Sequence, residues 1–421
     1  MTSLRFCMVT TFYPPRSFGG DAVAVQSLAR ALVRGGHHVT VVCDDDACRT
    51  LSGNRAPAPP ADDDGVVVHR LASGIAPLSV ALTQQTGRPI VHGATLRRLL
   101  DRGAFDVIHY HNLSLVGGPA ALSFGRGMKL YTAHEHWLVC PTHVLWRHRA
   151  EPCTGRQCTR CQLTYRRPPQ LWRHTGLLDR NLDHVDAFIA MSGFSRDKHH
   201  EFGFPRDMEV LPAFVRDPGP PPPFAAASSA RPYFLFVGRL ESIKGLEDVI
   251  DAFATFEEAD LVIAGEGTDR RALVARAARN PRVRFAGFQS GAALSALYSG
   301  AQAVIASSRG FETFGLSVIE AYSRGVPVLA RRMGSYLELV ENTGAGETFG
   351  DVAELQSTMR RMLGDPTRRR DMGATAYARF RATFSEDVVV PRYLALVDRM
   401  LSRRRGVPSL PAPATAPPAH V

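Results

Sequence analysis

Two glutamates in the segment 308–330 have a spacing that could serve a phosphorylated sugar compound. Glu312 and Glu320 are separated by seven residues, and Gly315 lies between them. We expect Gly315 to open a helix whose first backbone N–H groups attract an anion, and a glycine lets a phosphate approach the main chain closely. On that helix Glu320 stands about 7.5 Å farther along the axis, a distance that fits a phosphate and its ribose. Glu312, in the loop before the helix, could accept hydroxyl hydrogen bonds from a sugar on the other side of the phosphates.

Two cations occupy a second segment, 236–253, in which a buried strand leads into a turn. Arg239 and Lys244 flank this turn ahead of a predicted helix. Two cations near one strand end can neutralise a diphosphate, and they stabilise the charge that develops on a nucleoside diphosphate leaving group. Alone, the cations are more typical of a salt-bridged turn and the glutamates of an exposed loop. Together, with their Gly and Pro punctuation, the two segments predict a phosphate site.

These side chains need regular elements to position them, and the sequence alternates short apolar runs with helical patterns. That alternation is the mark of parallel α/β units. A helix is predicted from residue 22 to residue 33, between glycine pairs at 19–20 and 35–36. Strands are predicted at residues 6–9, 38–42, 66–69, 107–111, 130–132, 187–191, 233–237, 261–264, 283–285, 303–306 and 326–329.

A proline-rich stretch at 216–232, RDPGPPPPFAAASSARP, divides this pattern. Such a composition favours an extended spacer, and 421 residues exceed what one hydrophobic core usually supports. The predicted fold is α/β, with two Rossmann-like domains that face each other across a ligand-binding cleft. The predicted divisions are an N-terminal domain at 1–215, a linker at 216–232, a C-terminal domain at 233–385, a helix returning to the N-terminal domain at 386–405, and a disordered tail at 406–421.

The glutamate and cation segments together resemble the donor site of family-4 retaining glycosyltransferases, which have the two-domain GT-B architecture. The resemblance implies that Arg239 and Lys244 contact the diphosphate, Glu312 the transferred sugar and Glu320 the ribose. It covers nearly the whole chain, densely from 233 to 350 and more loosely before 215. Other similar features are the Gly-Glu-Gly segment at 265–267, the FAGF segment at 285–288 and the Gly-Ser pair at 334–335, where the family often has two glycines.

Two N-terminal features resemble the same family. The pair Gly19-Gly20 is similar to the glycine loop whose backbone approaches the donor phosphates, although an ordinary strand-to-helix turn fits the spacing equally well. His134, just after a predicted strand, resembles the histidine beside the reacting sugar, and it is expected to orient that sugar rather than to act as a general base. His111 and His136 are weaker candidates.

The predicted site is therefore divided between the two domains. The residues predicted to act in catalysis are His134, Arg239, Lys244 and Glu312. The residues predicted to bind the donor are Gly19, Gly20, Gly265, Gly267, Phe288, Phe314, Gly315, Leu316 and Glu320.

Four cysteines, Cys140, Cys153, Cys158 and Cys161, have the spacing C-x12-C-x4-C-x2-C. Four thiolates can build a tetrahedral zinc site that stabilises a loop, and His143 or His148 could replace one of them. Because the spacing is not that of a standard zinc finger, free thiols are an equally good interpretation. The stretch 134–173 that holds these cysteines is an insertion rich in Trp, His and Arg. Since the family binds its acceptor in the N-terminal domain, we expect this insertion to cover the acceptor.

The net charge of the chain limits which classes of partner it is expected to bind. Fifty basic against forty acidic residues give a formal charge of +10, which suits an anionic ligand or surface, but no stripe of aromatic and basic residues typical of a nucleic-acid module occurs. Arginines at 368–370 could touch an anionic membrane that carries a lipid acceptor. Acidic runs at 44–46 and 62–64 could suggest Mg²⁺ or Mn²⁺, but we expect solvated loops, because Arg239 and Lys244 supply the charge of a metal. No cofactor is expected for the chemistry itself.

The sequence thus predicts an enzyme that moves a hexose-type sugar from a nucleotide-diphosphate sugar, with UDP as the preferred nucleotide, to an unidentified acceptor. Retention at the anomeric carbon is implied by the resemblance alone. The acceptor classes left open are lipid-linked saccharides, polysaccharides and small natural products. The alternatives are an epimerase of the same architecture, a catalytically silent sugar-nucleotide-binding protein and, more weakly, a zinc-dependent interaction module. Lacking a signal peptide and an apolar stretch of eighteen residues, the protein is expected in the cytoplasm, with the inner face of the membrane as a further hypothesis.

Overall fold

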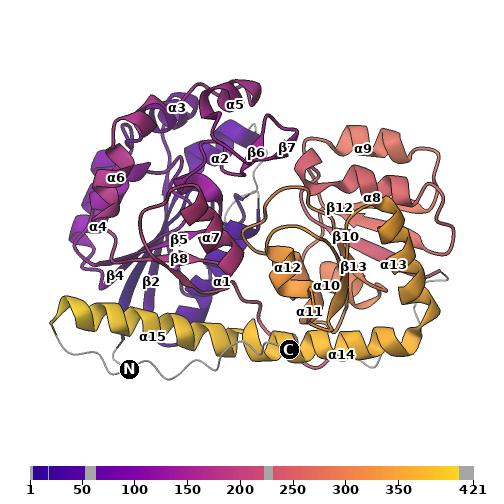
Figure 1. Ribbon diagram of the computed structural model, residues 1–421. Coiled ribbons are helices and arrows are strands. Elements are labelled where there is room, and N and C mark those ends of the chain that lie inside the picture. Colours follow the sequence, from indigo (N-terminus) through magenta and orange to yellow (C-terminus); the bar gives the residue numbers. More distant parts are fainter. Residues whose placement is uncertain (1–2, 18, 53–62, 222–230, 407–421) are drawn as a thin grey trace.

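The computed structural model describes residues 3–17, 19–52, 63–221 and 231–406, and it consists of two α/β domains that lie side by side (Figure 1). Most of the predicted linker and nearly all of the predicted tail lie outside the described residues. Each domain has a parallel sheet with helices on both faces. The predicted class, two Rossmann-like domains, is confirmed.

The N-terminal sheet has the strand order β3-β2-β1-β4-β5-β8-β9, and all of its pairings are parallel. Its central strands are near-continuous apolar runs, as expected for strands that helices cover on both faces. The strands are β1 (Arg5–Val9), β2 (His38–Asp44), β3 (Val67–Leu71), β4 (Val107–Tyr110), β5 (Met128–Ala133), β8 (Ala187–Ala190) and β9 (Met208–Val210).

The long helices of this domain pack on the sheet through apolar side chains, as the first of them shows. In the first of them, Val25, Leu28 and Leu32 recur at helical spacing and pack on the sheet. The helices are α1 (Gly20–Arg34), α2 (Asp45–Ser52), α3 (Ala76–Thr86), α4 (Gly93–Arg102), α6 (Leu177–Leu182) and α7 (Gly193–Glu201), with 3₁₀ turns η1 (Pro119–Ser123), η2 (His136–Leu138) and η3 (Leu171–His174). The insertion adds the small hairpin β6 (Trp146–Arg147) and β7 (Glu151–Pro152) and the helix α5 (Cys158–Thr164).

The C-terminal sheet has the order β12-β11-β10-β13-β14-β15 and is also parallel throughout. Its strands are β10 (Tyr233–Val237), β11 (Asp260–Ala264), β12 (Val283–Gly287), β13 (Val304–Ala306), β14 (Val328–Arg331) and β15 (Gly346–Phe349). Its helices are η4 (Ser242–Lys244), α8 (Leu246–Ala252), α9 (Arg270–Ala277), α10 (Gly291–Ser299), α11 (Leu316–Tyr322), α12 (Ser335–Val340), α13 (Val352–Gly364) and α14 (Pro366–Thr383).

The last helix, α15 (Glu386–Arg404), belongs to the N-terminal domain although it follows the C-terminal one. Val389, Tyr393 and Val397 are buried in the same apolar cluster as β1 and α1. Figure 1 shows α14 under the C-terminal domain and α15 continuing under the N-terminal domain. A backbone bridge between Val215 and Ser385 joins the two places where the chain crosses between domains.

The acidic run at 44–46 does not form the solvated loop expected from the sequence. Asp44 ends β2 and Asp46 lies in the first turn of α2, and both are buried. Asp46 binds His92 at 2.8 Å and the Ser73 hydroxyl at 2.5 Å, while Asp44 accepts from two backbone N–H groups of α2. The expectation was wrong because these carboxylates find enough protein donors to be buried.

Of the second acidic run, Asp63 is also buried. It accepts a hydrogen bond from the Tyr13 hydroxyl at 2.5 Å and another from the Gln26 amide at 3.0 Å. Arg30 completes its surroundings as an ion-pair partner. This carboxylate therefore anchors α1, and it is not solvated.

Candidate active site

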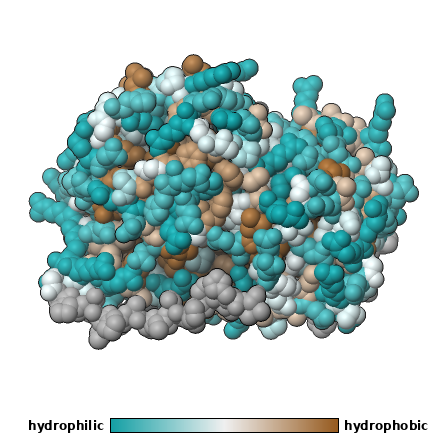
Figure 2. All heavy atoms as spheres, viewed as in Figure 1, coloured by the Kyte–Doolittle hydropathy of each residue, from teal (hydrophilic) through white to brown (hydrophobic). Residues whose placement is uncertain are grey.

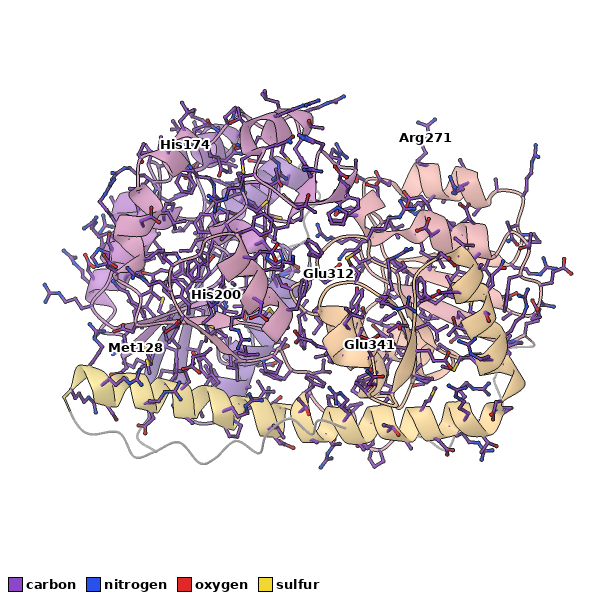
Figure 3. The ribbon with its side chains drawn as sticks, in the orientation of Figure 1. Met128, His174, His200, Arg271, Glu312 and Glu341 are labelled. Carbon is purple, nitrogen blue, oxygen red and sulfur yellow. The ribbon has the colours of Figure 1, made fainter. Side chains whose placement is uncertain are left out.

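Lys244 and Glu312 form an ion pair at the carboxyl edge of the C-terminal sheet, where the two predicted segments meet. Lys244 Nζ lies 2.5 Å from Glu312 Oε1, and the Ser308 hydroxyl donates to the same oxygen at 2.6 Å. Burial alone would raise the pKa of Glu312, but the charge and hydrogen bond of Lys244, the Ser308 hydroxyl and the charge of Arg239 bring that pKa below its ordinary value. Glu312 is thus held as a carboxylate at the boundary between the domains (Figure 3).

Arg239 follows β10 in a loop that two of the predicted donor-binding glycines shape. A Cβ on Gly265 would lie 1.9 Å from the carbonyl oxygen of Gly238, and one on Gly267 would lie 2.4 Å from that of Leu240. Gly265 also has a φ of +150°, which side chains rarely allow. These glycines therefore let the 265–267 backbone pack against the loop that carries Arg239. The Arg239 side chain is 46% exposed and pairs with Glu241 at 2.9 Å, so a ligand has to compete with that carboxylate for it.

Glu320 lies on α11 and is held by a tyrosine that the sequence did not suggest. Tyr298 donates its hydroxyl hydrogen to Glu320 Oε2 at 2.6 Å. Burial raises the pKa of Glu320, and the Tyr298 hydrogen bond and the charge of Arg324 oppose that rise. Tyr298 thereby fixes one carboxylate oxygen and leaves Oε1 for another donor.

The starts of α1 and α11, one from each domain, face each other. A Cβ on Gly20 would lie 3.0 Å from Leu316 Cδ2, so the two helix starts are in close contact. Neither helix has a side-chain cap at its first turn. The predicted glycine loop and the predicted anion-binding helix start are therefore brought together, and both dipoles point their positive ends to one place.

His134 directly follows the strand β5 and contacts the loop that holds Glu312. The Thr313 hydroxyl donates to the His134 carbonyl oxygen at 2.7 Å, and His136 Nε2 lies 3.3 Å from the Phe311 carbonyl oxygen. Because residues 311 and 313 both bind the 134–136 segment, Glu312 is fixed opposite the N-terminal domain. The predicted catalytic residues of the two domains thus share one site.

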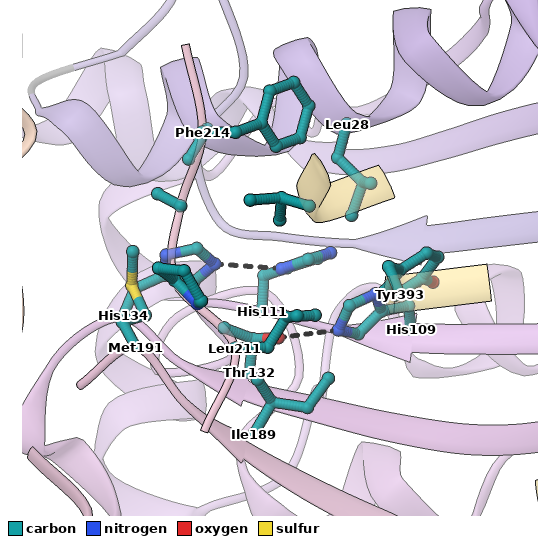
Figure 4. Close-up of a pocket in the computed structure, with 14 residues that line it drawn as sticks. Leu28, His109, His111, Thr132, His134, Ile189, Met191, Leu211, Phe214 and Tyr393 are labelled. Atoms are coloured by element: carbon teal, nitrogen blue, oxygen red, sulfur yellow. Dashed lines mark hydrogen bonds between the residues drawn. The ribbon is translucent and has the colours of Figure 1, made fainter. Parts of the chain in front are cut away.

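A second histidine supports His134 from within the N-terminal domain (Figure 4). His111 Nδ1 lies 2.9 Å from His134 Nε2. Burial lowers the pKa of both rings. The negative charges of Asp21 and Glu135 oppose this for His134, but its pKa is still lowered, so both rings are neutral near pH 7. His134 Nδ1 is buried and has no hydrogen-bond partner among the described residues, which leaves it available to a ligand.

Behind this pair lies a small cavity of about 50 Å³, between α1, the strands β4, β5 and β8, and α15. His111 Nε2, also buried, has no partner among the residues that the structure describes. In the same cavity, His109 binds the Thr132 hydroxyl at 2.8 Å and the Tyr393 hydroxyl at 3.0 Å. The ring that touches His134 is therefore one member of a buried polar row.

The remaining predicted donor residues differ in what their side chains can reach. Phe288, after β12, is 75% exposed and can meet a ligand. The Phe314 side chain is buried against Phe384, with ring centroids 5.9 Å apart, so its predicted contact with the donor cannot involve the ring. A Cβ on Gly315 would lie 2.8 Å from Leu339 Cδ1, so this glycine is required by packing as well as by any approach of a phosphate.

The four cysteines of the insertion are free thiols that share one neighbourhood. Burial raises the pKa of Cys153, and the nearby Cys140 and Cys161 raise it further; Cys140 and Cys153 do the same to Cys158. In the described parts of the chain, the one group of three potential ligands whose atoms all lie within 4.8 Å of one another is Asp44, Asp46 and His92, and protein donors already satisfy it. Zinc at the cysteines remains a prediction.

Three supporting residues escaped the sequence analysis. Ser308 and Tyr298 have no distinctive spacing, and only the fold brings them to Glu312 and Glu320. The third is Glu338, three residues beyond the Gly-Ser pair; its carboxylate accepts from the backbone N–H of Gly193 at 3.0 Å and from that of the next residue, and so caps α7 of the other domain. A contact across domains leaves no local signal in a sequence.

Both halves of the chain match family models. Residues 18–217 match Glycosyltransferase Family 4, and residues 224–379 match Glycosyl transferases group 1. The glycogen synthase of Mycobacterium tuberculosis is 29% identical over 426 residues, which cover 96% of each chain. The lipopolysaccharide core biosynthesis glycosyltransferase LpsD of Rhizobium meliloti is 31% identical over 229 residues, which are 52% of this chain and 66% of that protein.

Solved structures show the same arrangement of domains. The crystal structure of Anabaena HepE in complex with UDP-glucose superposes with a TM-score of 0.66 and 18% sequence identity, covering 95% of this chain and all of that one. At this identity the likeness bears on the fold alone.

Proposed function

We propose that this chain, which belongs to the family-4 glycosyltransferases of GT-B architecture, transfers a hexose from UDP-hexose to a saccharide hydroxyl with retention at the anomeric carbon. That it is a glycosyltransferase using a nucleotide-sugar donor follows from its family and its relatives. UDP is supported by the UDP-glucose bound in the Anabaena protein, and a saccharide acceptor by the names of the two relatives, a lipopolysaccharide core glycosyltransferase and a glycogen synthase. Of the three acceptor classes, this favours lipid-linked saccharides and polysaccharides over small natural products.

In the proposed reaction the acceptor oxygen bonds to the anomeric carbon, the bond from that carbon to the phosphate oxygen breaks, and the acceptor proton goes to the released UDP. Negative charge therefore grows on the diphosphate. Arg239, Lys244 and the two facing helix starts supply the positive potential that stabilises it. Lys244 must share its charge between Glu312 and the diphosphate when the donor binds.

The two carboxylates take different parts. Glu312, held ionised, accepts hydroxyl hydrogen bonds from the hexose, and Glu320 accepts from the ribose through the oxygen that Tyr298 leaves unused. His134 is neutral and offers Nδ1 to the sugar, so it orients the donor and does not act as a general base. Fixed cations supply the charge that a metal would provide, and no metal is needed for this chemistry.

One observation carries the proposal: the loop 311–313 holds Glu312 against Lys244 on one side and binds the His134 segment on the other. Thermal-shift measurements with UDP-, GDP-, ADP- and dTDP-sugars test it, since a ligand that binds the native state raises the melting temperature. We expect UDP-hexoses to give the largest shift, and NMR of the product to show the donor's anomeric configuration. Release of an altered free sugar without an acceptor would instead identify an epimerase.

We further propose that the four cysteines bind one structural zinc ion and that the protein works in the cytoplasm, where thiols stay reduced. Support comes from the shared neighbourhood of the thiols. Metal analysis of the purified protein should find about one zinc per chain, and Cys158→Ser should remove most of it, whereas Cys48→Ser, at a buried thiol of α2, should leave it bound. Equal zinc content in the wild type and Cys158→Ser would contradict the zinc site.

A further inference from the structure

A continuous part of the N-terminal surface has arginines but no acidic residues. Residues 65–100 and 153–178 contain neither Asp nor Glu. The arginines in these two segments are Arg70, Arg88, Arg97, Arg98, Arg156, Arg160, Arg166, Arg167 and Arg173. In a chain with forty acidic residues, two such segments create a local positive potential well above that of the whole protein.

The fold brings the two segments together. The Trp172 indole donates to the Gln84 carbonyl oxygen at 2.9 Å, which joins η3 to the end of α3. The backbone N–H of Gln170 donates to the Gln162 side-chain oxygen at 2.9 Å, which joins η3 to α5. The helices α3 and α5 therefore lie on one side of the domain, at its upper edge in Figure 1.

Large apolar side chains stand on the same surface with no protein cover. Leu78 on α3 is 52% exposed, Leu163 on α5 is 59% exposed and Leu171 is 69% exposed. Figure 2 shows brown, apolar spheres at this upper edge of the N-terminal domain. Leu78, Leu163, Leu171, Arg160, Arg166 and Arg167 together are called the arginine–leucine face below.

The arginines of this face are not neutralised. Arg160 and Arg166 are exposed and have no ion-pair partner among the described residues, and Arg167 contacts only the ring of Tyr165 by a cation–π interaction. Asp45 and Asp46 do not reach this face, because they are buried and pair with Arg70 and Arg49. Two exposed acidic residues flank the segment 153–178: Glu151, which pairs with Arg147, and Asp179 on α6.

The arginines at 368–370, which the sequence suggested for membrane contact, differ from those of the face. Arg368 pairs with Glu347 at 3.0 Å. Arg369 donates to the Met362 carbonyl oxygen at 2.8 Å. They are thus engaged within the C-terminal domain and are the weaker candidates.

We propose that the arginine–leucine face docks the protein on an anionic lipid bilayer. Unpaired arginines match the phosphates of acidic headgroups, and leucines at their side can enter the boundary between headgroups and acyl chains. A soluble polyanion such as a polysaccharide would use the arginines but would gain nothing from exposed leucines. The inference is independent of the proposed reaction, and it brings the insertion that begins at His134 to a membrane surface.

The first experiment measures co-sedimentation of the full chain with vesicles of phosphatidylcholine alone and of phosphatidylcholine mixed equally with phosphatidylglycerol. We expect binding to the anionic vesicles and little to the neutral ones, with a loss as salt rises. Equal binding to both vesicle types, or none to either, would overturn the proposal.

The second experiment separates this face from the general charge of the protein. The triple variant Arg160→Gln/Arg166→Gln/Arg167→Gln should bind anionic vesicles about 100-fold more weakly, at roughly 1 kcal/mol for each basic residue near the surface. The matched control is Arg271→Gln/Arg279→Gln/Arg284→Gln, which removes three exposed arginines of the C-terminal domain that have no ion-pair partner in the described chain. An equal loss in both triples would mean unspecific attraction.

The third experiment distinguishes a bilayer from a soluble polyanion. Leu163→Asn should weaken vesicle binding about tenfold, because a leucine side chain no longer enters the lipid. Val274→Asn on α9, at a residue 38% exposed, is the matched control and should bind as the wild type does. Full vesicle binding by Leu163→Asn together with loss in the arginine triple would assign the face to a polyanion and overturn the lipid proposal. Circular dichroism and the UDP thermal shift show whether each variant is folded.

Discussion

The two domains use different chemistry at the same cleft. Histidines occur at fourteen positions between residues 37 and 200, whereas residues 233–405 contain none. On the C-terminal side the site is made of fixed charges, Arg239, Lys244 and Glu312, and on the N-terminal side of buried neutral rings, His111 and His134. Permanent charge suits a diphosphate, and neutral donors and acceptors suit sugar hydroxyls. The division of histidines between the domains thus follows what each half has to bind.

The largest expected effect of this difference is on stability in acid. Burial lowers the pKa of His109 and His136 to about 3 and of His199 to about 4, and that of His111 well below its ordinary value. Groups with a lowered folded-state pKa stabilise the fold fully above the unfolded value near 6.5, and that stabilisation is lost as the pH falls from there. At pH 5 the loss is on the order of 2 kcal/mol for each ring.

One buried carboxyl acts in the opposite sense. Burial raises the pKa of Asp44 to about 7, so this group gains stability as the pH falls, but one carboxyl offsets only part of four rings. We expect the N-terminal domain to lose several kcal/mol between pH 7.5 and 5 while the C-terminal domain loses little. Hydrogen exchange of the intact protein, corrected for intrinsic rates and followed by mass spectrometry, would show it. Equal loss of protection in both domains would remove the basis of the comparison.

The next effect concerns the fixed charge. Lys244→Met should lower kcat/KM about 1,000-fold, because one of the two cations facing the leaving diphosphate is lost and Glu312 loses its ion-pair partner. Steady-state kinetics with the best donor from the thermal-shift screen measures this. Arg271→Met, at an exposed cation of the same domain, is the matched control and should keep full activity. A Lys244→Met enzyme with more than a tenth of the wild-type rate would contradict the assignment.

A smaller effect is expected from the neutral side. His111→Phe should lower kcat about 100-fold with little change in UDP affinity, because His134 loses the hydrogen bond that fixes its ring. His111→Asn places an amide where Nδ1 was and should recover most of that loss. His109→Asn, a change in the same cavity that does not touch His134, is the control for packing. If the Phe and Asn variants were equally impaired, His111 would have a role in folding alone.

The smallest effect is expected where Glu320 is held. Tyr298→Phe removes one hydrogen bond and leaves the ring in place, so UDP binding should weaken about tenfold while kcat changes little. Isothermal titration with UDP measures the affinity. Tyr322→Phe, which removes a buried hydroxyl bonded to the Leu339 carbonyl oxygen, is the matched control and should leave UDP affinity unchanged. An unchanged affinity in Tyr298→Phe would mean that Glu320 needs no support.

Much of the fold could be predicted from the sequence because its strands are apolar runs closed by Gly and Pro. The predicted strand at 233–237 coincides with β10, and the helix at 22–33 lies within α1. The strands β9 and β15 were not predicted, since MEV and GETF are short and half polar. Both are edge strands, and they are held by pairing with the neighbouring strand rather than by a strong β preference of their own residues.

The candidate site could also be predicted only in part from the sequence. Lys244, Glu312 and Glu320 stand in dense motifs and could be singled out, whereas Ser308 and Tyr298 beside them could not. Gly265 and Gly267 shape the Arg239 loop because a Cβ at either position would come within 2.5 Å of the backbone beside it. Such a close approach can be recognised only in a three-dimensional structure. The burial of Asp44 and Asp46 could not be anticipated either, because their donors come from residues 47, 73 and 92.

The helix α15 makes the two halves of the chain inseparable in assembly. Val389, Tyr393, Leu396, Val397 and Met400 of this helix complete a core whose other buried members precede residue 215. A ribosome that has finished the first domain has therefore not yet made all of its interior, and this surface stays open until almost the whole chain has emerged. Fragments divided at the linker should recombine only when they are produced in the same cell, because the second fragment carries α15, which completes the core of the first.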